Sequence, residues 1–316
     1  MDDLQLLKEM RADAPEPDDD RLGMIRVRLA APTTAKRRMM WRMPSLLAAT
    51  VAAAVALVLV LGRSELPQPQ ALPASAAEVL ERAALVAGER PLIASPRPGQ
   101  WLYHKYMQRQ PGESRGTTRA EWIRYDGRKL AVPDGRGGVW VEDIRISGDD
   151  LSPQQYAEKL RALPTDPAEL LAQVQSDRHW AVTGESVNAR AFRVLMLYLG
   201  QQALMPPKSE AAIYRALAQI PGVRVEPGVR DAMGRPGVGL SYEPSEPGVG
   251  TTRDADGQVV TRSYLILAAD TYRYLGRRVV WLRDEQSRGG VPNRAGAFYA
   301  DAELAAGLVD EPGQIP

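Results

Sequence analysis

The sequence predicts an α+β fold: a single transmembrane helix, then an extracytoplasmic antiparallel sheet with helices packed on one face. Two observations lead to this prediction. An uncharged, apolar stretch of twenty residues lies near the N-terminus, at 43–62. After it the hydrophobic pattern changes from helix to strands, then to helices and again to strands. This order is typical of an antiparallel sheet covered by helices.

The stretch 43–62 is long enough to cross a bilayer, because at about 1.5 Å per residue its helix covers the hydrocarbon core. From Leu46 to Leu61 only Thr50 is polar, so a soluble helix would have no polar face. Four basic residues precede the stretch and one follows closely, which predicts a cytoplasmic N-terminus. A cleaved secretory signal and a buried core helix are the alternatives.

The predicted span divides the chain into four segments. Residues 1–42 are cytoplasmic, 43–62 cross the membrane, 63–74 form a Pro-rich linker, and 75–316 form the extracytoplasmic α+β domain. Residues 43–316 carry 31 basic and 31 acidic residues, which argues against a nucleic-acid surface there. The chain has no cysteine, so disulfides, thiolate zinc sites and a lipid-modified cysteine anchor are excluded.

Charge is polarised within the cytoplasmic segment. All eight acids lie in residues 1–20, whereas residues 21–42 hold seven bases and no acid. The basic half can lie on anionic lipid headgroups, which leaves the acidic half in the cytoplasm. The segment is either a solvated tail that fixes topology or a docking segment for a basic cytoplasmic partner. The docking residues are then Asp18, Asp19, Asp20, Leu4 and Leu7.

The extracytoplasmic domain begins with a helix and a hairpin. Ser75–Glu78 form a capping box, and the helix that follows ends at Gly88. Residues 99–108 and 121–127 are rich in aromatic and β-branched residues, alternate in polarity and flank a Gly/Pro/Ser/Thr loop. This pattern predicts an antiparallel hairpin, followed by a third short strand at 138–144.

Four helices are expected next. Ser152–Gln155 and Asp166–Glu169 each combine an N-cap residue with Pro at the first helical position, so a short helix follows each of them. A longer helix is predicted over residues 183–201, and another over 208–219, before a Pro-Gly stop.

The remainder of the chain returns to strands. Turn-forming GRPG, DADG and AADT sequences separate segments of strand-like composition. The predicted strands are 223–233, 236–243, 258–268 and 272–282, and a last strand or helix lies between Ala297 and Leu308.

Residues with catalytic potential are few. His104 lies in the middle of a predicted strand, and no G-x-S-x-G motif accompanies it. His179 lies within the turn-like sequence SDRHW. The glycines of residues 234–239 suit a hairpin, since no G-K-[ST] follows them. Carboxylates such as Glu121 and Asp126 show no pattern of an acid–base pair. We therefore predict no enzymatic activity, no cofactor and no metal site.

Aromatic residues are concentrated in the first strands: Trp101, Tyr103, Tyr106, Trp122, Tyr125 and Trp140. Large rings on a sheet that curves over helices can line an apolar groove for a lipid or an extended peptide. The alternative is that they form the core between sheet and helices. The predicted groove residues are Trp101, Tyr103, Trp122 and Tyr125.

Several stretches along nearly the whole chain carry a family resemblance. They are MDDLQLLKEMRADAPEPDDDRL, WLYHKY, EWIRYDG, LPTDPAELL, PPKSEAAIYRALAQIPGV, YLILAADTYRYLG and GLVDEPGQIP. The chain resembles an uncharacterised actinobacterial family of single-pass membrane proteins, often encoded beside extracytoplasmic-function sigma factors. The element order is also similar to lipoprotein-carrier and sigma-regulator sensor domains, in which helices fill a half-open sheet. A lipoprotein-carrier-like half-barrel is the fold that this likeness implies.

Two functions are expected. The first is a membrane-anchored regulatory or sensory protein, whose exterior domain binds an envelope ligand and whose inner segment contacts a sigma factor. The second is a tethered carrier of lipid or lipoprotein in the envelope. The chain lacks the His/Cys zinc signature of the best-known anti-sigma domains.

Overall fold

The computed structural model describes residues 75–92, 95–146, 150–182, 185–243, 258–285 and 293–316. The predicted cytoplasmic segment, span and linker therefore lie outside the described residues. So do the proposed docking residues Leu4, Leu7, Asp18, Asp19 and Asp20. Within the described ranges, no helix is both long and apolar enough to cross a bilayer.

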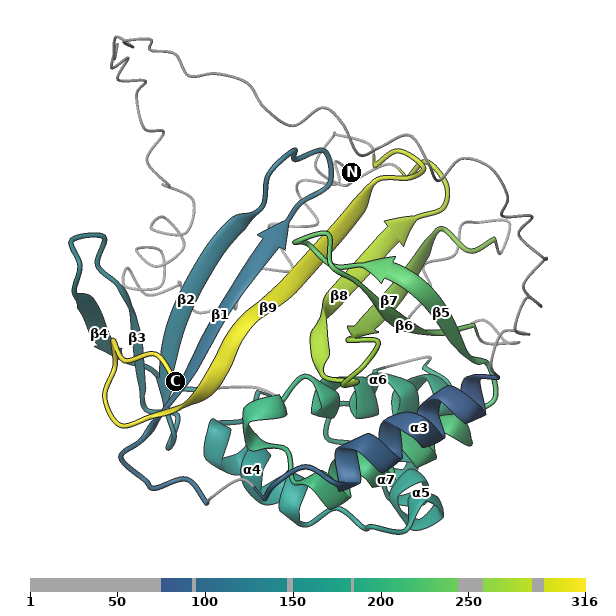
Figure 1. Ribbon diagram of the computed structural model, residues 1–316, viewed down its shortest axis with the longest axis horizontal. Helices are drawn as coiled ribbons and strands as arrows, with labels where there is room; N and C mark the ends of the chain where they lie inside the picture. Colours follow the sequence, from purple (N-terminus) through teal and green to yellow (C-terminus); the bar gives the residue numbers. More distant parts are fainter. Residues whose placement is uncertain (1–74, 93–94, 147–149, 183–184, 244–257, 286–292) are drawn as a thin grey trace, which may run out of the picture. The chain divides into compact units, whose positions relative to one another are not determined.

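The described chain is α+β, as predicted, and its sheet has nine antiparallel strands (Figure 1). Their order across the sheet is β4-β3-β2-β1-β9-β8-β7-β6-β5, so the last strand lies at the centre, between β1 and β8. The strands are β1 (Trp101–Arg109), β2 (Thr117–Arg124), β3 (Lys129–Pro133), β4 (Val139–Asp143), β5 (Val223–Arg230), β6 (Pro236–Tyr242), β7 (Thr261–Leu267), β8 (Tyr274–Trp281) and β9 (Phe298–Val309).

The α-helices gather on one side of the sheet, below it in Figure 1. Alternation along β6 and β7 fixes which face they cover. Leu240 and Leu265 belong to the core shared with the helices, whereas Tyr264 and Ile266 belong to a separate cluster. The helices are α3 (Ala76–Gly88), α4 (Pro153–Arg161), α5 (Pro167–Ser176), α6 (Val187–Leu199) and α7 (Pro207–Ala218), with a 3-10 turn at Gln202–Leu204.

Local capping signals place the helix starts. Ser75 and Ser152 each accept the N–H of the N3 residue, and the N3 side chain bonds back to the cap, so both capping boxes form. Asp166 caps α5 by accepting the N–H groups of Ala168 and Glu169. The prediction for α6 began too early, because Ser186 is its cap and its first helical residue is Val187.

Two strand predictions need correction, and one that left two alternatives open is now decided. β3 was missed, since its five residues lie between two turns and show too short a pattern. β2 begins at Thr117 rather than at 121, and it ends at Arg124, because Gly127 turns back with positive φ and donates its N–H to the Arg124 carbonyl. The segment near the C-terminus is a strand, β9, although it is rich in alanine. Pairing with β1 along its length outweighs the helical preference of alanine.

Candidate functional site

Three of the four predicted groove residues form a filled cluster on the face of the sheet away from the helices. Trp101, Tyr103 and Trp122 are 7%, 2% and 5% exposed, and the Tyr103 and Trp122 ring centroids lie 5.0 Å apart. The Trp122 indole N–H donates to the carbonyl of Gln314 at 2.7 Å, so the C-terminal segment covers the cluster. Tyr125 lies apart, in the helix-side core, where its hydroxyl accepts from Arg161.

A cavity of about 670 Å³ lies instead between α6 and the helix-facing side of the sheet. Its size falls within the usual range for sites that bind small molecules. Strands β1, β2, β7, β8 and β9 form its floor, and α6 forms one wall. The side chains from the sheet include His104, Tyr106, Gln108, Glu121, Ser263, Leu265, Tyr274, Arg277, Asp301 and Glu303.

Helix α6 has two apolar faces, and this explains how it separates the cavity from the helical core. Val194, Leu195 and Leu199 point into the core and are fully buried. Phe192 and Met196 lie one turn apart on another face and line the cavity with Leu197. Phe192 also stacks on Tyr242 of β6, with centroids 5.4 Å apart. The wall of the cavity is therefore mainly apolar, and Arg193 is its one charged residue among the lining side chains of α6.

The floor is polar where β1, β2 and β9 lie side by side. His104 faces Glu121 directly across the β1–β2 pair, and Tyr106 faces Glu303 across the β1–β9 pair. His104 Nε2 lies 3.5 Å from a Glu303 carboxylate oxygen, and its ring stacks on Tyr106 at 4.9 Å between centroids. No described group of three or more His, Asp or Glu side chains is arranged to hold a metal ion.

A second part of the floor is an internally bonded network around Asp301. One carboxylate oxygen of Asp301 accepts the Arg277 backbone N–H at 2.7 Å and the Tyr274 hydroxyl at 3.1 Å. The other accepts the Arg277 guanidinium at 2.9 Å. Burial, and then the Asp301 charge, raise the pKa of Tyr274 well above 10, so its hydroxyl keeps its proton and donates it.

Burial also raises the pKa of Glu121 above 4.5, and the charges of His104 and Arg119 only partly oppose the shift. The pKa of the neighbouring Tyr106 is raised too, first by burial and then by Glu121. At this end of the floor, desolvation thus raises the pKa of both side chains, and among the described residues no arginine or lysine bonds the Glu121 carboxylate.

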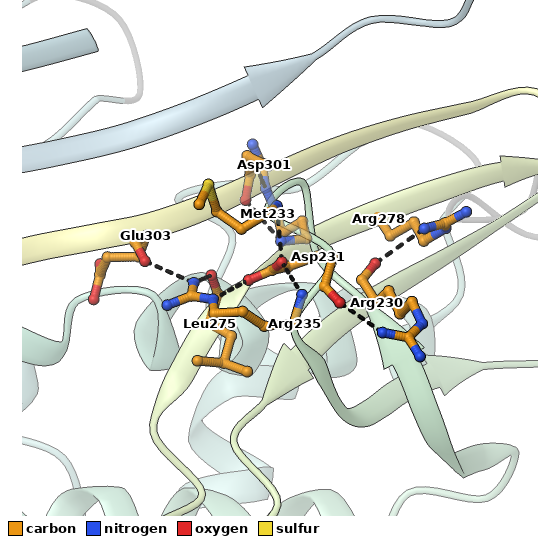
Figure 2. Close-up of polar contacts among 10 residues, drawn as sticks. Arg230, Asp231, Met233, Arg235, Leu275, Arg278, Asp301 and Glu303 are labelled. Carbon is orange, nitrogen blue, oxygen red and sulfur yellow. Dashed lines mark hydrogen bonds and ion pairs between the residues drawn. The ribbon is translucent and has the colours of Figure 1, made fainter. Parts of the chain in front are cut away.

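The strand that carries Asp301 and Glu303 is held from the other face of the sheet (Figure 2). β9 pairs with β8 only as far as Ala300, and beyond it the two strands diverge. Arg235, in the turn between β5 and β6, spans the divergence by donating to the carbonyls of Leu275 at 3.2 Å and Glu303 at 2.8 Å. Asp231 fixes the Arg235 guanidinium at 2.6 Å and is buried.

A smaller cavity of about 240 Å³ adjoins the first and shares His104, Glu121 and Glu303 with it. Tyr103 borders this smaller cavity, as does Leu102. Of the four aromatic residues predicted for a groove, Tyr103 is therefore the one that borders either cavity.

The floor of the cavity was not predicted as a site, although its sequence carries a signal. On β1 the positions after Leu102 on the helix-facing side are His104, Tyr106 and Gln108, where a filled core would have apolar residues. Which strands lie next to β1 was not visible, because β9 comes from the other end of the chain.

No family model and no curated protein matches this chain. A solved structure of an outer membrane lipoprotein-sorting protein domain from Vibrio parahaemolyticus is similar over 75% of this chain and 93% of that chain, at 11% identity and a TM-score of 0.16. A score this low supports no conclusion about fold or function.

Proposed function

We propose that residues 75–316 form a binding module for a small amphipathic ligand, held in the cavity between α6 and the sheet. The cavity is the observation that carries this proposal. Its α6 wall is mainly apolar, with Arg193 bonded to Glu185, and much of its floor is polar, so it suits a molecule with an apolar chain and a polar head group. The lipoprotein-carrier-like half-barrel expected from the sequence belongs to the same proposal.

Both expected functions need such a site. A sensor must bind a ligand before it signals, and a carrier must bind one before it delivers it. The cavity supports this shared step. Attachment to the membrane through 43–62 and contact with a sigma factor through Asp18, Asp19 and Asp20 stay predictions, because these residues lie outside the described ranges.

The absence of cysteine gives a direct test, because an introduced thiol is the only one in the chain. Met196→Cys puts a thiol in the cavity wall. The matched control is Met233→Cys, at a position 50% exposed in the β5–β6 turn. With the full chain in phosphatidylcholine nanodiscs, the rate of alkylation by N-ethylmaleimide is measured with and without decanol.

We expect decanol at ten times its dissociation constant to slow alkylation of the thiol from Met196→Cys about tenfold, since bound and free sites exchange. Alkylation at position 233 should not change. Equal rates at position 196 with and without decanol, up to its solubility limit, would contradict binding of a neutral amphipathic molecule in the cavity.

A further inference from the structure

The charged side chains that line the cavity determine which head group it can bind. This inference rests on the proposed function. The lining includes three carboxylates, Glu121, Asp301 and Glu303, and two guanidiniums, Arg193 and Arg277, together with His104. The preference of the site depends on which of these groups are already paired.

Both arginines are paired with carboxylates of the protein. Arg277 bonds Asp301 through its backbone N–H and its side chain. Arg193 makes a bidentate contact with Glu185, at 2.7 Å to each oxygen, and the Glu185 side chain is fully buried. Arg190 approaches the same carboxylate at 3.9 Å. An anionic head group would therefore have to compete with an existing partner for either guanidinium.

The other two carboxylates have no such partner. Among the described residues, no arginine or lysine bonds the side chain of Glu121 or Glu303. His104 lies 3.5 Å from Glu303. Arg119, two residues before Glu121 on β2, is exposed. The Glu303 side chain is only 15% exposed. Partly desolvated carboxylates without a cation are costly, and a cation supplied by a ligand would offset that cost.

We propose that the ligand carries a primary ammonium as its head group, bound by Glu121, Glu303 and the imidazole of His104. An ammonium has three N–H donors, and this end of the floor offers, on neighbouring strands, the two carboxylates and the imidazole of His104, which accepts in its neutral form. The apolar chain then lies along Phe192 and Met196 of α6. The class of ligand is a long-chain amine or a lipid whose head group ends in an amine.

Three probes with the same ten-carbon chain test the charge: decylamine, decanol and decanoate. Each is titrated against alkylation of the thiol from Met196→Cys in the full chain in nanodiscs. Decylamine should protect at about tenfold lower concentration than decanol, since hydrogen bonds to a charged group are the stronger ones. Decanoate should protect least. Glu303→Gln and Glu121→Gln, in the same background, should each raise the concentration of decylamine needed by a larger factor than that of decanol, because only decylamine loses a charged partner.

The matched control is Glu158→Gln, at an exposed acid of α4 whose side chain accepts a hydrogen bond from Gln154. It should leave all three titrations unchanged and so corrects for attraction of amines to the protein surface. If decylamine and decanoate protect equally, or if both glutamine variants keep the preference for decylamine, the ammonium site is wrong while the binding module stands. If none of the probes protects position 196, the binding module itself is wrong.

Discussion

Strand β1 contributes to two regions of opposite character. On one face, Trp101 and Tyr103 pack into a filled aromatic cluster that the C-terminal segment covers. On the other, His104 and Tyr106 lie on the floor of a cavity beneath α6. The same strand thus stabilises the fold through one set of alternating residues and presents polar groups through the other. The contrast teaches that the face toward the helices, where a core is expected, is the one that holds the candidate site.

The filled face should be the one that carries stability. Trp122→Ala removes the ring beside Tyr103 and the hydrogen bond to Gln314, so the free energy of unfolding should fall by about 3–5 kcal/mol. Urea unfolding of the full chain in nanodiscs measures it. Trp140→Ala is the matched control, because Trp140 is 56% exposed on the edge strand β4 and its removal should cost less than about 1 kcal/mol. Equal losses in both variants would contradict the contrast between the faces.

Arg235 connects the two faces of the sheet. Its guanidinium donates to the backbone carbonyl of Glu303, and the side chain of Glu303 lines the cavity on the other face. Arg235→Met should lower the free energy of unfolding by about 2 kcal/mol, because the buried Asp231 carboxylate loses its partner. The same measurement on Arg215→Met should show less than about 1 kcal/mol, since the Arg215–Glu81 pair is exposed. If Arg235→Met lowers the free energy of unfolding no more than Arg215→Met does, the hydrogen bonds of Arg235 between β8 and β9 do not stabilise the fold.

A substitution on the face that carries the cavity should have the smallest effect on stability. Unlike the two substitutions above, it should stabilise the protein near pH 7. Burial raises the pKa of Glu121, so its contribution to stability is fully present below pH 4.5 and is lost as the pH rises through the raised pKa. Glu121→Gln should therefore raise the thermal midpoint near pH 7 and leave it almost unchanged near pH 4.

Glu81→Gln is the control for that pH dependence. A hydrogen bond from Arg215 lowers the pKa of Glu81, so its stabilisation is present at pH 7 and is lost as the pH falls through the lowered pKa. The two variants should thus change the midpoint at pH 7 in opposite directions. A fall in midpoint for both would indicate that Glu121 has a partner that the structure does not describe.

Local signals in the sequence predicted much of the fold. The capping residues Ser75, Ser152 and Asp166 act within one turn, so the starts of α3, α4 and α5 could be located from the sequence. The hairpin of β1 and β2 was also predicted, because its pairing is local. The short strand β3 was missed, and the central position of β9 could not be inferred.

The candidate site depends on contacts between distant parts of the chain. His104 was taken as an ordinary sheet residue, and Glu303 was not considered at all. Their approach requires β9 to pair with β1, roughly two hundred residues earlier in the sequence, with a register shift beside Tyr106. Such pairing is specified by the register of the whole sheet rather than by either strand's own sequence. The aromatic residues misled for the same reason, since composition does not say which face of a strand a ring occupies.

The divergence of β8 from β9 makes the sheet two smaller sheets joined along a short edge. Three residue pairs join them directly, and beyond these the bonds of Arg235 and Asp301 continue the connection. His104 and Glu303 lie on one smaller sheet, and Leu265 lies on the other. A ligand that fills the cavity would therefore contact both smaller sheets at once.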